Sequence, residues 1–512
     1  MNYLSYSNFL LTYLIIVIMT NHLNTEDLGT KNIIFLYVDD LRHLHDKNVN
    51  LPNIKKIMEN GITFKNAFCQ QALCAPSRNS LLTGRRPDAL RLYDFYSYWR
   101  HEVSNFTTLP QLLKANGYHT YSIGKIFHPG ASSNYTDDYP YSWSEFPYHP
   151  PSEKYKDAAV CRDRITKQLH SNLVCPVKVN EQPDNTLPDL QSLKFAINIL
   201  KENKYNPFFL AIGFHKPHIP LKFPSHYLEK IPKRNVKPPK YPKKPDNMPL
   251  VAWHPWRDVR KRDDIRQLNI SYPMGIMPPK WTIRIRQSYY AAALYIDNLI
   301  GKLMRYVNNS NTIVVLTSDH GWSLGENGLW AKYSNFDVAL RVPLIFNIPE
   351  ISPNIIDTPV EQIDVFPTIA DLTGIKGIPK CKNTRDKSRL CFEGRSLLPI
   401  MAGKIQNGGF AISQYPRPSV KPRKNSDSPR LKEIKIMGYS IRTQRYRYTE
   451  WISFNSTTFT RNWNKVYGSE LYDNLFDPDE SNNVCKEDRY RYIRKKLLKI
   501  LRDQYLDYLL EV

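Results

Sequence analysis

The sequence predicts an α/β fold in which helices flank a large, mostly parallel central sheet, with a smaller α+β subdomain at the C-terminal end. Short β-branched apolar runs without alternation, as at 33–38 and 312–317, are typical of strands buried on both faces, and such strands form parallel sheets. A helical pattern with a period of 3.6 residues covers 286–307. Strands that alternate with helices favour a layered α/β architecture.

The predicted strands also indicate where ligand groups gather. The first strand, 33–38, ends in two aspartates, and the strand at 312–317 is followed by Ser318, an aspartate and a histidine. Two further apolar runs, 208–213 and 342–346, are predicted as strands of the same sheet. Ligands of such sheets bind at the carboxyl ends of strands. Four side chains fall at those ends: Asp39, Asp40, Asp319 and His320.

The C-terminal part of the chain has a different pattern. A proline- and lysine-rich stretch at 415–430 predicts a boundary loop. After it, 434–451 has hairpin-like strand patterning and 489–509 is predicted as a closing helix, whose apolar residues form a side to bury and whose basic residues face solvent. The predicted division is a signal peptide with an uncertain cleavage site, a catalytic domain and a C-terminal subdomain, at 1–28, 29–415 and 416–512.

The N-terminus, sequons and cysteines predict passage through the secretory pathway. The apolar block at 9–19 is too short to span a bilayer and suits a signal peptide, although the positive n-region is missing; an uncleaved amphiphilic anchor is the alternative. We expect no stable membrane insertion once the signal is removed. Asn-x-Ser/Thr sites begin at Asn105, Asn134, Asn269, Asn308 and Asn455.

The chain has seven cysteines, and their spacing predicts two local pairs. Cys161/Cys175 and Cys381/Cys391 could each close a small loop in an oxidising compartment. Two other cysteines have no assigned role and could pair with each other or remain free thiols: Cys69 and Cys485. No Cys-x-x-Cys occurs, so no spacing resembles a zinc site.

The charge balance indicates a polyanionic partner. Lys and Arg total 71 against 48 Asp and Glu, which gives the 512 residues a formal net charge of +23. Such an excess suits nucleic acid, an anionic membrane or a sulfated polysaccharide, or simply a solvated basic surface. The basic, proline-rich stretch at 230–244 is an extended segment that either lines the rim of a substrate cleft or forms a solvated loop.

The most specific motif is Cys74-Ala75-Pro76-Ser77-Arg78, continued as far as Leu82-Thr83-Gly84. A nucleophile at the start of a predicted helix lies in positive potential, which favours an oxyanion, and Arg78 lies one turn on and can donate to the same group. The alternative is a cysteine that is simply buried before a helix, and such a cysteine would not require Pro76, Ser77 and Arg78 to occur together. The motif resembles the signature of the sulfatase family, whose fold is similar to that of alkaline phosphatase.

The resemblance implies a modified nucleophile and a metal. In sulfatases the cysteine is oxidised during secretion, by the formylglycine-generating enzyme, to formylglycine (3-oxoalanine), whose hydrate is the nucleophile. A cluster of carboxylates suits a hard divalent cation, and the resemblance implies one calcium ion that binds the sulfate and the modified residue. The implied ligands are Asp39, Asp40, Cys74 and Asp319, while His320 stands where the family usually has Asn or Gln and could either ligate or orient the site.

Three further segments resemble sulfatase motifs, namely Gly124-Lys125-Ile126-Phe127-His128, Phe214-His215-Lys216-Pro217-His218 and Ala331-Lys332-Tyr333. Alone, each Lys or His would be taken as a solvated residue. The resemblance implies that Lys125 and Lys332 bind the sulfate and that His128 contacts formylglycine and acts as the base that releases sulfate. It also implies a sulfate contact for His215, which is our candidate to protonate the departing sugar oxygen.

Longer matching segments narrow the implied substrate. Those at 83–88, 318–326 and 330–337, among others, resemble the sulfatases that remove the 2-O-sulfate of terminal iduronate. The resemblance implies a lysosomal or secreted exosulfatase that degrades heparan sulfate and dermatan sulfate, with no nucleic-acid partner. Three alternatives remain: a sulfatase for another sugar or small sulfate ester, a phosphoester hydrolase, which would not need the Cys74 signature, and a heparin-binding protein without turnover.

Overall fold

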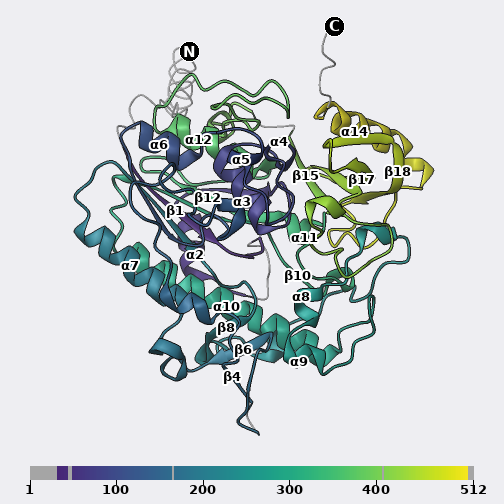
Figure 1. The fold of residues 1–512 in the computed structure, drawn as a ribbon, viewed down its shortest axis with the longest axis horizontal. Helices are drawn as coiled ribbons and strands as arrows, with labels where there is room; N and C mark the ends of the chain where they lie inside the picture. Colours follow the sequence, from purple (N-terminus) through teal and green to yellow (C-terminus); the bar gives the residue numbers. More distant parts are fainter. Residues whose placement is uncertain (1–30, 44–48, 164–165, 406–408, 506–512) are drawn as a thin grey trace, which may run out of the picture.

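A large mixed sheet forms the centre of the molecule. The computed structural model describes residues 31–43, 49–163, 166–405 and 409–505 (Figure 1), so the predicted signal peptide at 1–28 lies outside the described residues. The strand order is β13-β2-β12-β9-β1-β7-β3, with β14 also paired to β2. The strands are β1 (Asn32–Val38), β2 (Ile62–Phe68), β3 (His119–Gly124), β7 (Phe208–Phe214), β9 (Thr312–Ser318), β12 (Arg341–Asn347), β13 (Asn354–Ile356) and β14 (Val360–Glu361).

The predicted, mostly parallel arrangement is confirmed. β1 pairs in parallel with both β7 and β9, and β3 pairs in parallel with β7. β12, also predicted as a strand, runs antiparallel to both of its neighbours, β2 and β9. The apolar runs of the sequence thus form the middle of the sheet.

Strand β1 is apolar throughout because its two sides face two different cores. Ile34, Leu36 and Val38 pack in the cluster that contains the buried face of α10. The alternate residues, such as Phe35, pack with side chains of the helices on the other face, including Phe366. The helices of the first face are α2 (Pro52–Glu59), α7 (Pro188–Glu202) and α10 (Pro279–Met304); those of the second are α3 (Cys74–Thr83), α6 (Leu109–Ala115) and α12 (Val365–Leu372).

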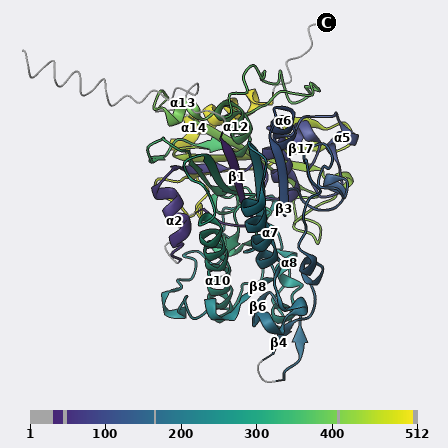
Figure 2. The same cartoon turned by 90° about the vertical axis from the view of Figure 1, so that its left-hand side faces the viewer.

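The longest of these helices confirms the pattern predicted at 286–307. α10 begins earlier than predicted, at Pro279, because proline suits the first turn of a helix and the apolar side continues through residues such as Ile285. α7 and α10 lie side by side (Figures 1 and 2). No helix of the described segments is both long and apolar enough to cross a membrane.

The C-terminal segment forms a separate antiparallel sheet, drawn in yellow-green in Figure 1. Its strands are β15 (Phe410–Arg417), β16 (Ile436–Thr443), β17 (Tyr446–Asn455) and β18 (Thr460–Asp473), and α14 (Arg491–Asp503) packs on it. The predicted hairpin and closing helix are therefore present. Leu497 and Leu501 are the buried residues of α14, while Lys495 and Lys496 are exposed. The predicted boundary between 415 and 416 falls within β15, all of which pairs with β16.

Short elements and two disulfides complete the described fold. Both predicted disulfides are present, Cys161–Cys175 and Cys381–Cys391, while Cys69, Cys74 and Cys485 are free and buried. The short helices and strands are α4 (Pro87–Leu90), α5 (Trp99–Glu102), α8 (Arg257–Arg260), α9 (Asp263–Arg266), α11 (Asp337–Leu340), α13 (Leu398–Met401), β4 (Cys161–Arg162), β5 (Leu169–His170), β6 (Val174–Val177), β8 (Leu221–Pro224), β10 (Ser323–Leu324) and β11 (Trp330–Ala331).

Candidate active site

The carboxyl ends of β1 and β9 bring two pairs of polar residues together. Val38 and Ser318 are register partners, so the residues that follow them lie side by side. The backbone N–H of Asp40 donates to Oδ1 of Asp319 at 3.0 Å, and so does the N–H of His320. Asp40 has a φ of +63°, a left-handed conformation that aspartate tolerates better than most residues. The structure thus brings together the four side chains expected at the strand ends.

Cys74, the first residue of α3, lies at the centre of this group. Its Sγ is 3.0 Å from Nζ of Lys332, 3.6 Å from Nζ of Lys125 and 3.4 Å from Nε2 of His320. The thiol also lies 3.7 Å from Oδ1 of Asp39. Burial raises the pKa of the Cys74 thiol, although both lysines oppose the shift. An unmodified Cys74 is therefore a poor source of thiolate.

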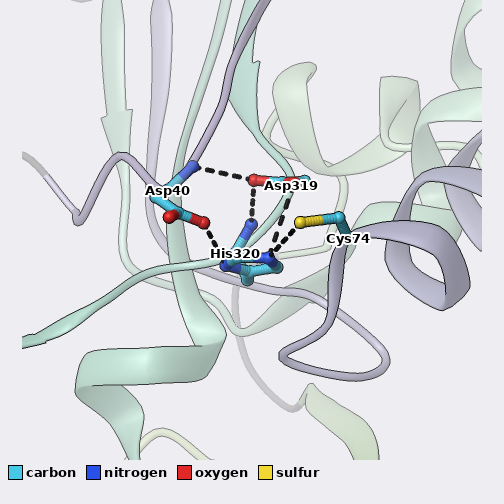
Figure 3. Close-up of side chains that lie close together, drawn as sticks. All are labelled: Asp40, Cys74, Asp319 and His320. Atoms are coloured by element: carbon cyan, nitrogen blue, oxygen red, sulfur yellow. Dashed lines mark hydrogen bonds and ion pairs between the residues drawn. The ribbon is translucent and has the colours of Figure 1, made fainter. Parts of the chain in front are cut away.

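Four of these side chains could share a metal ion. Candidate ligand atoms of Asp40, Cys74, Asp319 and His320 all lie within 4.8 Å of one another (Figure 3). Oδ2 of Asp40 is buried and has no hydrogen-bond partner among the residues that the structure describes, which is unusual for a carboxylate oxygen. A cation would satisfy that oxygen, and the grouped carboxylates suit a hard divalent ion. The cluster is therefore suited to hold a metal ion.

Arg78 connects the two strand ends. Its Nη2 donates to Oδ1 of Asp39 and its Nε to Oδ2 of Asp319, both at 2.9 Å, and its Nη1 donates to the carbonyls of Lys125 and Ile126. Burial opposes ionisation of Asp39, but Lys125, His218 and Arg78 hold its pKa well below the usual range. The expected Arg78 is thus in the site, where its guanidinium fixes the carboxylates.

Two lysines connect the carboxylates to Cys74. Nζ of Lys125 lies 2.6 Å from Oδ2 of Asp39, and Nζ of Lys332 lies 3.0 Å from Oδ1 of Asp40. Lys125 follows Gly124, whose φ is +67° and where a Cβ would meet the carbonyl of Gly213 at 2.3 Å. Only glycine fits at that turn. The two ammonium groups therefore converge on Cys74 from different elements.

The two histidines expected in the site, His128 and His215, lie in different surroundings. His128 lines the same cleft as Cys74, and burial, followed by the charges of Lys125 and Arg78, holds its pKa well below the ordinary value. The imidazole of His215 instead lies between Glu153, at 3.1 Å, and Asp189, at 3.4 Å.

His218 was missed by the sequence reasoning. It lines the cleft with Cys74, whereas His215 does not, and its Nε2 is 3.9 Å from Oδ2 of Asp40. Both histidines belong to the segment singled out in the sequence, but nothing in its pattern tells which imidazole faces the nucleophile. The carboxylates that contact the imidazole of His215, Glu153 and Asp189, come from distant segments.

A cleft of about 750 Å³ opens above Cys74. Its wall includes His128, His218 and Lys332, and the loop that follows β15 contributes residues such as Lys424. In the whole lining, lysines and arginines outnumber carboxylates. The remaining cations, none of them from the basic segment at 230–244, are Lys156, Arg257, Lys261, Arg262 and Arg430, and the carboxylates are Asp157, Asp258, Asp427 and Glu433. A basic cleft with a buried cluster at its floor suits a small anionic group attached to a larger polar molecule.

Comparison with known proteins gives a family and several relatives. The family described as Sulfatase matches residues 25–375. The chain is 45% identical over 503 residues to iduronate 2-sulfatase of Homo sapiens, a match that covers 89% of this chain and 91% of that protein. It is 27% identical over 402 residues to choline-sulfatase of Rhizobium meliloti, covering 73% of this chain and 72% of that one.

The solved structures share the fold. Phosphonate monoester hydrolase from Silicibacter pomeroyi superposes with a TM-score of 0.68 at 20% identity, covering 93% of this chain and 95% of that one. At this identity the likeness establishes the common architecture alone.

Proposed function

The chain belongs to the sulfatase family, and from this premise we propose that it hydrolyses the 2-O-sulfate of terminal iduronate in heparan sulfate and dermatan sulfate. The observation that carries the proposal is the 45% identity to human iduronate 2-sulfatase along 89% of the chain. The basic cleft above Cys74 supports a sulfated glycosaminoglycan as the substrate, because its cations match the charge of a polyanion.

The nucleophile in this proposal is formylglycine at position 74, formed from Cys74 during secretion by the formylglycine-generating enzyme. The raised pKa of the Cys74 thiol supports a modified residue over a thiolate. The hydrated aldehyde supplies one hydroxyl that attacks sulfur and a second hydroxyl through which sulfate is released. The start of α3 places this group in positive potential.

A calcium ion would be held by Asp39, Asp40, Asp319 and position 74, with His320 as a ligand or as a group that orients the others. Bound calcium supplies charge stabilisation at the sulfate oxygens. Among the carboxylate oxygens of these three aspartates, Oδ2 of Asp40 is the one without a hydrogen bond in the described part of the chain, so Asp40 is the ligand with the strongest structural support. Arg78 pairs with both Asp39 and Asp319 and so holds the two carboxylates in place.

The other side chains bind the substrate and move protons. Lys125 and Lys332 would bind sulfate oxygens where they now approach Cys74. Neutral His128, whose pKa is low, would take the proton of the second hydroxyl. We assign protonation of the departing sugar oxygen to His218 instead of His215, because His218 lines the cleft and His215 is held by two carboxylates. Burial and the charge of Lys156 hold the pKa of His218 well below its ordinary value. The negative charge of a bound sulfate ester would raise that pKa and so favour the protonated imidazole that this role requires.

The protein would act in the lysosome or after secretion. A direct test compares hydrolysis of 2-sulfated iduronate disaccharide, glucosamine-6-sulfate and choline sulfate by the purified, secreted protein. We expect a kcat/KM for the iduronate substrate at least about 100-fold above the other two, which corresponds to about 2.7 kcal/mol of selectivity. Preference for either competitor would contradict the proposed substrate and leave the sulfatase chemistry intact.

A further inference from the structure

Lys156 is a partly buried cation of the cleft wall that the proposed mechanism does not use. Lys156 directly follows the 3-10 helix η3 (Pro151–Tyr155) and lines the cleft that contains Cys74. It also lines the smaller cavity that contains Asp39 and His218. Its side chain is partly buried and, within the described segments, its ammonium has neither a hydrogen-bond partner nor an ion pair.

Four other cations in or beside the cleft have carboxylate partners, whereas Arg257 and Lys424 are exposed to solvent. Lys125 and Lys332 pair with Asp39 and Asp40. Arg262 pairs with Asp157, the residue next to Lys156, at 2.8 Å. Lys261 in turn contacts Asp258 at 3.6 Å.

Burial lowers the pKa of Lys156, and the nearby charge of Lys125 lowers it further. A partly desolvated, unpaired ammonium is unfavourable by itself, so an anion bound beside it would be stabilised. Lys156 is therefore suited to an external anionic group.

The backbone of Lys156 is held in place. Nζ of Lys222 donates to the carbonyls of Tyr155 and Lys156 at 2.8 and 3.2 Å. The N–H of Lys156 donates to the carbonyl of Glu153, whose carboxylate pairs with His215. These contacts connect the segment that carries Lys156 to the segment of His215. The backbone from which the Lys156 side chain extends is therefore held in place.

The proposed substrate has two anionic groups on one sugar ring, a sulfate and a carboxylate. The sulfate is assigned to Lys125, Lys332 and the metal at the floor of the cleft. We propose that Lys156 binds the carboxylate of that same sulfated uronate and so selects sulfated uronic acids over neutral sulfated sugars. This inference rests on the proposed function and extends it to a second anion-binding position.

The test uses two substrates that differ only in the carboxylate. One is a 2-sulfated iduronide, and the other is the same glycoside with its carboxyl group reduced to a hydroxymethyl group. For Lys156→Met, we expect KM for the iduronide to rise about tenfold with kcat nearly unchanged, because a contact made equally in ground and transition states affects binding alone. For the reduced glycoside, we expect KM within about twofold of wild type.

Two further variants separate charge from structure. Lys156→Arg keeps the charge and should restore KM for the iduronide to within about threefold of wild type. Lys154→Met removes an exposed lysine two residues away, outside the cleft lining, and should leave both substrates unaffected. Thermal unfolding of each variant checks that the fold is intact.

Two results would overturn the role of Lys156: no change in KM for the iduronide, or equal losses on both substrates. Failure of the proposed function has a different signature. Wild-type protein would then leave the iduronide intact while it hydrolyses another sulfate ester, and the assignment of Lys156 would fall with it.

Discussion

The backbone N–H of Asp40 donates a 3.0 Å hydrogen bond to the carboxylate of Asp319, across the junction between the ends of β1 and β9. This bond ties two strands that are distant in sequence into one site. Arg78 adds a second tie, from Asp319 to Asp39. The positions of Asp39, Asp40, Asp319 and His320 therefore depend on the register of the central parallel strands.

We expect Asp40→Asn to lower kcat/KM by about 100-fold or more, because the change removes a charge from the proposed calcium site. Added calcium should partly restore activity, with a half-saturating concentration above that of wild type. Asp357→Asn is the matched control, since Asp357 is exposed and pairs with Lys65 away from the cleft. Equal calcium dependence in wild type and Asp40→Asn would argue against Asp40 as a ligand.

Cys74→Ser should stop after the first chemical step. A serine hydroxyl can attack sulfur, but it lacks the second hydroxyl needed to expel sulfate, so the enzyme should accumulate a covalent sulfate ester. Mass spectrometry of the peptide that carries position 74, after incubation with substrate, would detect it. A variant that turns over repeatedly, or one that never acquires the ester, would contradict this mechanism.

The two histidines of the 214–218 segment should respond differently to the leaving group. We expect His218→Gln to lower kcat for the sugar substrate by about 100-fold, because a sugar oxygen must be protonated as it departs. The loss should be much smaller with an aryl sulfate, whose phenolate leaves without a proton. His215→Gln is the paired variant, and its effect should be similar on both substrates; the reverse pattern would return the acid role to His215.

His149 should stabilise the fold most strongly in acid. Contacts with the carboxylates of Asp137, at 3.0 Å, and Glu153, at 3.6 Å, raise its pKa to about 10 from an ordinary value near 6.5. The stabilisation is therefore fully present below about pH 6.5 and is lost as the pH rises towards 10.

Because the His149 side chain is 38% exposed, solvent screening reduces the effect, and we expect His149→Gln to lower the free energy of unfolding by about 1–2 kcal/mol at pH 5. Denaturant unfolding at pH 5, 7 and 9 measures the difference. A difference that grows with pH would show that the ion pairs do not act as described.

The sequence was sufficient to predict which residues meet at the strand ends. Unbroken apolar runs such as 33–38 identify strands buried on both faces, and the carboxyl ends of adjacent parallel strands must converge. The approach of Asp39 and Asp40 to Asp319 follows from that rule. The placement of Cys74 at a helix start also followed from its local pattern, and the structure has α3 begin there.

What the sequence could not predict depends on contacts between distant segments. The imidazole of His215 lies between Glu153 and Asp189 and does not line the cleft that contains Cys74, and neither carboxylate is near it in sequence. Lys156 belongs to no motif singled out in the sequence, and only the tertiary structure places it in the lining of the cleft. The C-terminal sheet begins at Phe410 because β15 pairs with β16, while the proline-rich stretch indicated a later boundary.

The chemical state of position 74 tests the account most directly. Protein secreted by cells that contain the formylglycine-generating enzyme should be digested, and the peptide that carries position 74 analysed by mass spectrometry. We predict an aldehyde at that position, reactive towards a hydrazine probe, in the fraction of the protein that has sulfatase activity. Active protein in which position 74 is entirely an unmodified cysteine thiol would contradict the proposed mechanism.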